Sequence, residues 1–305
     1  MISIIIPVFN SENTIGTLVN NIVKVLGNDY QFEIMLINDS SEDNSENKCK
    51  ELVEKFSSVS LFSLSKNFGE HNAIMAGLNK CSGDHAVIMS DDLQHSSDAL
   101  LKLIKYGIKE KDNFDVVYTY YNKKKYGFFK NFGSKFNDIV ANFLLTKPRN
   151  LYLSSFKFIN RFLITEIIKH QSPFTYIDGL ILGTTNKIGK IEVEHGERTY
   201  GKSGYTLMKM LQLWSNMSTG FSIVPLRLSL LMGSILSFIG FILAIIFFVE
   251  RLTDNTFPSG LASIFVSVTI FSGAILISVG LVGEYVGRVL ISLNKKPAIY
   301  TNSGF

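Results

Sequence analysis

The sequence Val87-Ile88-Met89-Ser90-Asp91-Asp92-Leu93-Gln94 decides how the rest of the chain is interpreted. Residues 85–89 form a short apolar run that predicts a buried strand, and this run ends in two adjacent carboxylates. Open α/β sheets bind their ligands at the carboxyl ends of the strands. Asp91 and Asp92 therefore indicate a site for a hard divalent cation, Mg²⁺ or Mn²⁺, that would hold a diphosphate. A solvated Asp-Asp turn is the alternative interpretation of this pair.

The composition is that of a globular chain with an apolar final third. Of 305 residues, 46% are hydrophobic, which allows one or two domains with a real core. A net charge of +4 is too small to indicate nucleic acid as a partner. Cys49 and Cys81 lack metal-like spacing and are expected to be reduced, buried thiols of a cytosolic domain. No basic segment with a cleavage site precedes the first strand, so a signal peptide is not expected.

Strands and helices are predicted to alternate along the first 120 residues. The expected strands are residues 2–6, 32–37, 59–64, 85–89 and 115–118. The first expected helix begins near residue 10, and the second ends near residue 56. Two further helices are expected at residues 70–79 and 97–110. This alternation indicates βαβ units, a mostly parallel sheet and right-handed crossovers. The fold class is therefore α/β.

Polar loops follow the first four predicted strands and meet at one edge of the sheet. They contribute Asn10, Glu12, Asp39, Lys66, Asn67, Asp91 and Asp92. A nucleotide fits this edge, with Asp39 accepting from a base N–H or a ribose hydroxyl and Asp92 holding a metal-bound diphosphate. No G-x-G-x-x-G follows the first strand and no P-loop motif occurs, which argues against a dinucleotide site of the Rossmann type.

Four motifs carry a resemblance to a known family: Pro7-Val8-Phe9-Asn10, Ile37-Asn38-Asp39-Ser40-Ser41, Lys66-Asn67-Phe68-Gly69 and Ser90-Asp91-Asp92-Leu93-Gln94. They resemble the successive motifs of family 2 glycosyltransferases with the GT-A fold, a Rossmann-like sheet with flanking helices. The most similar subgroup is that of polyprenyl-phosphate glycosyltransferases, which includes dolichol-phosphate mannose synthase and undecaprenyl-phosphate glucosyl and aminoarabinose transferases. Residues 67–73 and Asp178-Gly179-Leu180 most resemble the aminoarabinose branch. The resemblance covers essentially the full length.

The resemblance implies roles for individual residues. Asp39 would contact the nucleobase or ribose, and Asp92 would be the main metal ligand, helped by Asp91. The candidate nucleotide-binding residues are Pro7, Phe9, Asn10, Glu12, Asp39, Lys66, Asn67 and Asp91. Ser90 departs from the family pattern, because it replaces the first acid of the D-x-D element. Ser155 also departs, because it precedes Phe156 where an acid is frequent, and the second metal ligand and any general base therefore stay open.

The middle of the chain carries basic and aromatic residues that suggest a lipid acceptor. Residues 120–136 mix lysines, Lys130 among them, with aromatics, which favours a membrane-surface segment over a solvated basic loop. Asp178 is a candidate acceptor-site residue or base, and a helix cap is the alternative. Residues 198–205 form a glycine-bearing loop before an amphipathic helix, a setting that suits phosphate. The loop matches the family's R-x-x-G-x-S-x-Y element, and its candidate phosphate-binding residues are Arg198, Lys202, Ser203 and Tyr205.

Two uncharged runs in the last third predict a transmembrane hairpin. Residues 228–249 would extend about 33 Å as a helix, enough to span a bilayer, and residues 261–283 form a second run. Basic residues flank the pair, so both termini and the catalytic domain are expected on the cytoplasmic side of the inner membrane. Gly233, Gly240, Gly273 and Gly280 permit close helix contacts and a homo-oligomer.

The expected organisation follows from these segments. It comprises a nucleotide-sugar-binding half (1–120), an acceptor-side part (121–205), an interfacial helix (206–225), two transmembrane helices (226–291) and a cytoplasmic tail (292–305).

The predicted function is that of an inverting, metal-dependent membrane glycosyltransferase, with Asp92, Asp91, Arg198 and Lys202 as candidate catalytic residues. It would move a sugar from a nucleotide-sugar, UDP-linked by resemblance, to undecaprenyl phosphate. The alternatives are a GDP-mannose-dependent polyprenyl-phosphate mannosyltransferase and a catalytically impaired membrane scaffold, which Ser90 keeps open.

Overall fold

The structure is a computed structural model that describes residues 1–27, 29–121, 151–170, 172, 175–194, scattered positions between 226 and 249, 260–293 and 301–304. The chain divides into two compact units, residues 1–210 with 295–305 and residues 211–294. Residues 122–136 of the expected basic-aromatic segment and the expected interfacial helix at 206–225 lie outside the described residues.

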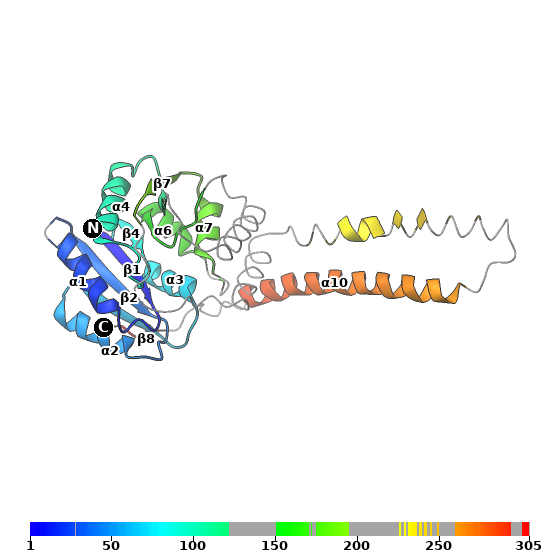
Figure 1. The fold of residues 1–305 in the computed structure, drawn as a ribbon, viewed down its shortest axis with the longest axis horizontal. Helices are drawn as coiled ribbons and strands as arrows, with labels where there is room; N and C mark the ends of the chain where they lie inside the picture. The colour runs from blue at the N-terminus through cyan, green and yellow to red at the C-terminus, as the bar shows by residue number, and fades with distance from the viewer. Residues whose placement is uncertain are drawn as a thin grey trace. The chain divides into compact units, whose positions relative to one another are not determined.

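The first unit is built on a sheet of eight strands, in the order β7-β5-β6-β4-β1-β2-β3-β8 (Figure 1). The strands are β1 (Ile2–Val8), β2 (Phe32–Asn38), β3 (Val59–Leu64), β4 (His85–Ile88), β5 (Val116–Tyr120), β6 (Lys157–Asn160), β7 (Ile188–Glu192) and β8 (Thr301–Gly304). β1 pairs in parallel with β2 and β4, and β2 pairs in parallel with β3. The predicted α/β class and its parallel centre are confirmed.

Two antiparallel strands make the sheet mixed rather than simply parallel. β6 runs antiparallel to both β4 and β5, and β8 runs antiparallel to β3. Neither strand was predicted. Residues 301–304, which lie in the expected tail 292–305, supply β8 and pair with the edge of β3, which lies at the end of the parallel strands.

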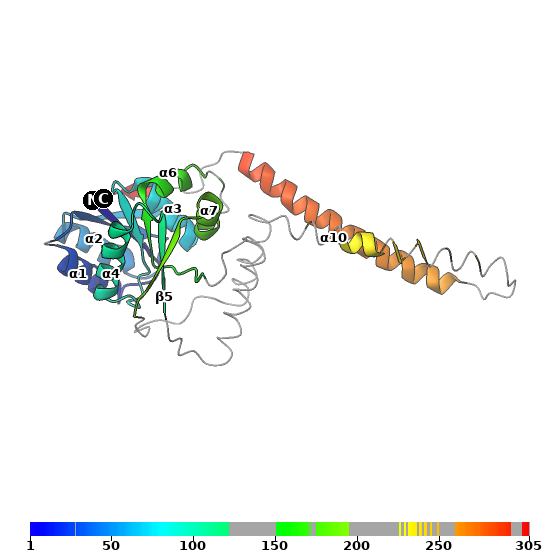
Figure 2. The same ribbon diagram turned by 90° about the horizontal axis from the view of Figure 1, so that it is seen from above.

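Helices cover both faces of the sheet (Figure 2). They are α1 (Ile15–Leu26), α2 (Ser45–Lys55), α3 (Glu70–Lys80), α4 (Ser97–Lys109), α6 (Arg161–Ile167) and α7 (Ile177–Thr184). Successive side chains of a strand point to opposite faces, so Ile4 and Ile6 of β1 pack in the core that α1, α2 and α4 cover, whereas Ile5 packs in the core under α3, α6 and α7. β1 is therefore apolar on both faces, as a central parallel strand should be.

The start of α1 differs from the prediction. The helix begins at Ile15 with Thr14 as its N-cap, and no side chain caps it. Asn10, Ser11 and Glu12 precede it as a loop, in which Asn10 has a left-handed backbone with φ 54°. Their backbone N–H groups donate to side chains between Ser41 and Ser45. This displacement keeps the three residues at the carboxyl edge of the sheet.

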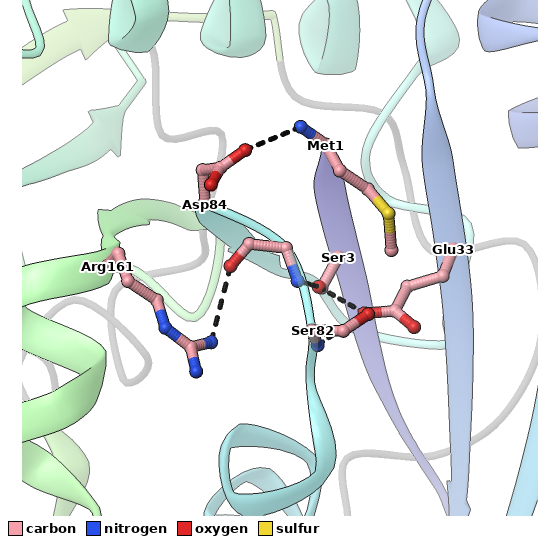
Figure 3. A network of polar contacts seen from close by, with 7 residues as sticks. Met1, Ser3, Glu33, Ser82, Asp84 and Arg161 are labelled. Atoms are coloured by element: carbon pink, nitrogen blue, oxygen red, sulfur yellow. Dashed lines mark hydrogen bonds and ion pairs between the residues drawn. The ribbon is translucent and has the colours of Figure 1, made fainter.

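A polar network ties the opposite, amino-terminal edge of the sheet together (Figure 3). The Glu33 carboxylate of β2 accepts from the Ser3 hydroxyl of β1 at 2.5 Å and from the Ser82 backbone N–H at 2.8 Å. Arg161 of α6 donates to the Gly83 carbonyl oxygen at 3.3 Å. A Cβ at Gly83 would lie 2.6 Å from the Ser3 hydroxyl oxygen and 2.8 Å from the Ser3 backbone nitrogen. Both distances are too short for a side chain, so this position requires glycine.

Both cysteines are free and buried in this unit, as predicted. Burial raises the pKa of the Cys49 thiol to about 12, so this thiol stays protonated at neutral pH.

The second unit contains the long helix α10 (Leu261–Leu293). The Ser229 and Ser278 hydroxyl oxygens lie 2.8 Å apart, so Ser229 lies beside α10. Side chains such as Leu276 and Ile277 are exposed along it. Among the residues that the structure describes, no helix combines the length and apolar character that crossing a bilayer requires. Nine of the 22 residues of the expected run 228–249 lie outside the described residues.

Candidate active site

Three loops at the carboxyl edge of the sheet hold non-glycine residues in a left-handed backbone conformation. Asn10 follows β1 with φ 54°, Ser40 follows β2 with φ 56°, and Leu93 follows β4 with φ 60°. Such angles are uncommon outside glycine and persist only where the surroundings enforce them. Their concentration at one edge marks this edge as the candidate active site.

Asp39 organises the turn between β3 and α3. Its two carboxylate oxygens accept from the backbone N–H groups of Phe68 and Gly69, both at 2.8 Å. Gly69 adopts φ 88°, which only glycine takes up without strain, and thereby aims its N–H at Asp39. Burial raises the pKa of the Asp39 carboxyl, opposed by these two hydrogen bonds. The predicted nucleotide-contacting acid is thus 3% exposed and holds the loop that carries Lys66 and Asn67.

The adjacent acids Asp91 and Asp92 have different surroundings. Asp91 accepts, through its Oδ2 atom, from the backbone N–H of Phe9 at 3.2 Å and from the Ser11 hydroxyl. Burial raises the pKa of the Asp91 carboxyl. Asp92 is half-buried, and its Oδ1 accepts from the backbone N–H of Gln94 at 3.2 Å. Asp91 therefore connects to the loop after β1, whereas Asp92 contacts Gln94 within its own loop.

Ser90 and Ser155 meet beside these acids. β4 and β6 are antiparallel, so the end of one adjoins the start of the other, and the two hydroxyl oxygens lie 3.1 Å apart. Both positions depart from the family pattern in the sequence, and the structure brings the two departures together.

Asp178 forms a buried ion pair with Lys157. Lys157 lies on β6 and is 2% exposed, and its Nζ donates to Asp178 Oδ1 on α7. The Tyr118 hydroxyl donates to the same oxygen at 2.7 Å. Asp178 thus has its charge balanced within the protein. This placement favours a structural role over the expected roles of base or acceptor-site residue.

Glu70 and His71 open α3 near this group, and sequence reasoning gave neither of them a role. The Glu70 side chain is accessible to solvent, yet protein surrounds it on most sides, and this desolvation raises the pKa of its carboxyl, opposed by Lys157 and assisted by Asp91. His71 packs edge-on against the Tyr176 ring, with centroids 4.8 Å apart. Burial lowers the pKa of His71 to about 4, so its ring is neutral at pH 7.

The other predicted nucleotide-binding residues fall into two groups. Asn10 and Glu12 use their side-chain oxygens to accept from the backbone N–H groups of Glu42 and Asn44, at 2.9 and 3.1 Å. They build the loop, and their expected contacts with a nucleotide stay predictions. The side chains that reach the surface at this edge are Phe9, which is 40% exposed, Lys66 and Asn67, while Pro7 at the end of β1 is half-buried.

The expected phosphate-binding residues Lys130, Arg198, Lys202, Ser203 and Tyr205 lie outside the described residues. Over the described part of the chain, no three His, Cys, Asp or Glu side chains converge as a metal-binding group. Mg²⁺ in nucleotide sites is often held by one or two carboxylates and completed by phosphate oxygens and water, so the acidic pair at the end of β4 fits such a cation without a third acid.

A mixed α/β sheet with acids at the carboxyl ends of its central strands places the protein in the class of GT-A-like folds. Glucosyl-3-phosphoglycerate synthase from Mycobacterium tuberculosis, solved with Mn²⁺ and UDP-glucose, has a TM-score of 0.52 and 18% identity over 70% of this chain and 75% of that chain. The same synthase solved with Mg²⁺ and UDP has a TM-score of 0.53 and 15% identity over 72% and 77%. At sequence identities of 18% and 15%, this similarity shows a shared fold and no more.

The model of glycosyl transferase family 2 matches residues 3–168, and the chain belongs to this family. It is similar over its length to undecaprenyl-phosphate 4-deoxy-4-formamido-L-arabinose transferases. The protein from Proteus mirabilis is 28% identical over 98% of this chain and 92% of its own length. The protein from Serratia proteamaculans is 29% identical over the same shares. The predicted family and enzyme class are confirmed.

Proposed function

We propose that this glycosyltransferase moves a sugar from a nucleoside-diphosphate sugar to undecaprenyl phosphate. The observation that carries the proposal is the shared edge of β1, β2 and β4, where the turn held by Asp39 and the half-buried Asp92 lie at the carboxyl ends of parallel strands. That edge binds ligands in open α/β sheets. Similarity to undecaprenyl-phosphate transferases over 98% of the chain supports the acceptor.

The donor is proposed to be a UDP-sugar. Phe9 offers an exposed aromatic face for a base, and the Asp39 turn supplies polar groups for the nucleoside. The M. tuberculosis synthase with this fold was solved with UDP-glucose. A GDP-sugar is the second candidate, as in polyprenyl-phosphate mannose transfer.

Asp92 is proposed to hold a divalent cation, Mg²⁺ or Mn²⁺, with the diphosphate. When bound, the cation neutralises negative charge on the leaving nucleoside diphosphate. The chain itself supplies position: Asp92 at the end of β4, the Asp39 turn and the loop after β1 fix the donor, while Arg198 and Lys202 are proposed to bind phosphate oxygens.

The acceptor phosphate is proposed to act as nucleophile without a protein base. A phosphate monoester has a second pKa near 6, so it is largely dianionic at pH 7. One of its oxygens forms a bond to the anomeric carbon while the bond from that carbon to the diphosphate oxygen breaks, which inverts the anomeric centre. The ion pair of Asp178 with Lys157 is consistent with this scheme, because Asp178 has no need to take up a proton.

A lipid acceptor calls for attachment to the inner membrane, with the catalytic unit on the cytoplasmic side. The uncharged runs 228–249 and 261–283 and the basic residues around them support a membrane hairpin.

A screen of nucleotide-sugars against membranes holding the full chain tests the proposal. Radiolabel should pass into the lipid fraction from one donor and require a divalent cation. Asp92→Ala should abolish transfer, whereas Asp98→Ala, which removes an exposed acid from the first turn of α4, should not. Transfer at the normal rate by Asp92→Ala contradicts the metal role. Nucleotide-sugar binding without lipid-dependent release of nucleoside diphosphate favours a catalytically impaired scaffold, the alternative that Ser90 and its contact with Ser155 suggest.

A further inference from the structure

The Asp91 carboxylate joins two loops that lie 80 residues apart in the sequence. Its Oδ2 atom accepts both from the backbone N–H of Phe9, at 3.2 Å, and from the Ser11 hydroxyl. A carboxylate oxygen has two lone pairs, so these two donors use the hydrogen-bonding capacity of Oδ2. Asp92, the next residue, makes its backbone contact to Gln94 instead.

The loop that Asp91 holds is residues 9–12, which we term the β1 loop. Its four consecutive backbone N–H groups all donate to side chains of other elements. Phe9 donates to Asp91. The other three donate to the segment from the loop after β2 to the first residue of α2: Asn10 to Ser41 at 3.1 Å, Ser11 to Ser45 at 2.6 Å and Glu12 to Asp43 at 3.2 Å. The β1 loop is therefore fixed from both sides, and Asp91 is its anchor toward β4.

The anchored loop includes a strained backbone conformation. Asn10 sits in the left-handed region, with φ 54°, between the two residues that bind Asp91. Strained backbone of this kind persists where surrounding contacts over-determine it. The Asp91 side chain therefore holds the backbone of Phe9, whose ring is exposed, against the loop that carries Asp92.

We propose that Asp91 is a positioning residue that fixes the β1 loop against the acidic motif after β4, and that it is not itself a metal ligand. The inference rests on the proposed function. Asp91 would set the separation between the surface for the nucleoside and the carboxylate for the cation, so that a nucleoside diphosphate meets both at once.

Two substitutions at one position separate this role from metal ligation. Asp91→Asn keeps an oxygen that accepts from Phe9 and Ser11 but removes the charge that a hard cation needs. Asp91→Ala removes both hydrogen bonds. Ser11→Ala removes one of them and leaves the carboxylate in place. Hydrogen bonds to a charged group are strong enough that losing both should weaken nucleotide binding by about ten- to a hundredfold.

The test uses the full chain in detergent, with Mn²⁺ binding followed by electron paramagnetic resonance and UDP binding by calorimetry with and without Mn²⁺. Asp91→Asn should bind Mn²⁺ alone as the unaltered chain does, and lose only about threefold in UDP affinity. Asp91→Ala should lose UDP affinity even in the absence of Mn²⁺, and Ser11→Ala should lie between the two. Asp92→Asn should instead lose Mn²⁺ affinity and the part of UDP affinity that depends on Mn²⁺.

Some outcomes would overturn the proposal. If Asp91→Asn loses Mn²⁺ affinity as Asp92→Asn does, Asp91 is a ligand and the proposed function stands. If Ser11→Ala and Asp91→Ala, both with unaltered circular dichroism, keep full UDP affinity, the anchoring has no part in nucleotide binding. An unaltered chain that binds neither UDP nor GDP contradicts the proposed function itself, and this inference with it.

Discussion

The hydroxyl oxygens of Ser90 and Ser155 lie 3.1 Å apart, where the end of β4 adjoins the start of β6. Two carboxylates at that distance would repel each other unless a cation or a shared proton lay between them. Two hydroxyls need neither, because one donates to the other. The strand ends beside Asp91 and Asp92 therefore stay together without help from a metal ion.

Ser90→Asp should raise the affinity of the chain for Mn²⁺ by about tenfold, because a second carboxylate joins Asp92 at the proposed cation site. The same change should lower stability without the cation, since it adds a like charge to a partly desolvated acidic group. Titration with Mn²⁺ under electron paramagnetic resonance, together with thermal unfolding, measures both. Ser155→Ala is the control: it removes the hydroxyl contact at a cost of about 1 kcal/mol and should leave Mn²⁺ affinity unchanged. An unchanged Mn²⁺ affinity in Ser90→Asp would show that position 90 faces away from the cation.

Removing one partner of the buried ion pair between Lys157 and Asp178 should be costly. Lys157→Met leaves the Asp178 carboxylate buried, with the Tyr118 hydroxyl as its remaining hydrogen-bond donor among the described residues, which should destabilise the protein by about 3–5 kcal/mol. Adding Asp178→Leu to Lys157→Met should restore much of that stability, because neither member of the pair is then left as an unpaired buried charge. Thermal unfolding of the full chain in detergent measures the three variants.

A surface pair provides the matched control for that experiment. Lys169 pairs with Glu166 three residues earlier, and the Lys169 side chain is 63% exposed. Lys169→Met should change the free energy of unfolding by less than about 0.5 kcal/mol. A similar small effect of Lys157→Met would mean that water reaches Asp178.

His71 should make the protein acid-sensitive. Burial lowers its pKa from 6.5 to about 4, with Asp178 opposing and Lys157 assisting. The unfolded chain therefore binds a proton between these values that the folded chain does not, so stability is full above pH 6.5 and falls as the pH drops toward 4. A shift of this size corresponds to about 3 kcal/mol once both states are protonated.

Unfolding temperatures between pH 7 and pH 4 measure this dependence. His71→Gln, which carries no titratable ring, should show a shallower decline than the unaltered chain. The same variant should retain the contribution of every carboxylate, so the difference between the two curves isolates His71. Identical curves would contradict a neutral, buried imidazole.

The sequence predicted the centre of the sheet well and its margins poorly, for a physical reason. β3 was expected at residues 59–64 and is observed there, because an apolar strand between polar loops depends on local pattern alone. β6 was missed because it begins with Lys157, a charge that becomes compatible with a buried strand only through Asp178 on another element. β8 was missed because its partner strand lies over 200 residues earlier in the chain.

The sequence predicted which residues lie at the candidate site, but not which contacts their side chains make there. The polar loops were correctly expected at the carboxyl ends of the strands. The side chains of Asn10 and Glu12 accept hydrogen bonds from backbone N–H groups of another segment. This arrangement depends on the left-handed turn at Asn10, which no local motif specifies. The contact between Ser11 and Asp91 likewise joins loops that only the fold brings together.

Asp39→Asn should weaken UDP binding by about tenfold or more, although the two side chains have the same shape. Each Asp39 oxygen accepts one backbone N–H, from Phe68 and from Gly69. Asparagine has a single oxygen, and its NH₂ group would face one of these donors, leaving a buried N–H without an acceptor at a cost of about 1–3 kcal/mol. The turn that carries Lys66 and Asn67 should then loosen, and the unfolding temperature should fall with it. Calorimetry with UDP and thermal unfolding measure the two effects, and Asp29→Asn, at an exposed position after α1, is the control that should change neither. Full UDP affinity and an unchanged unfolding temperature in Asp39→Asn would mean that the turn keeps its shape without the second acceptor.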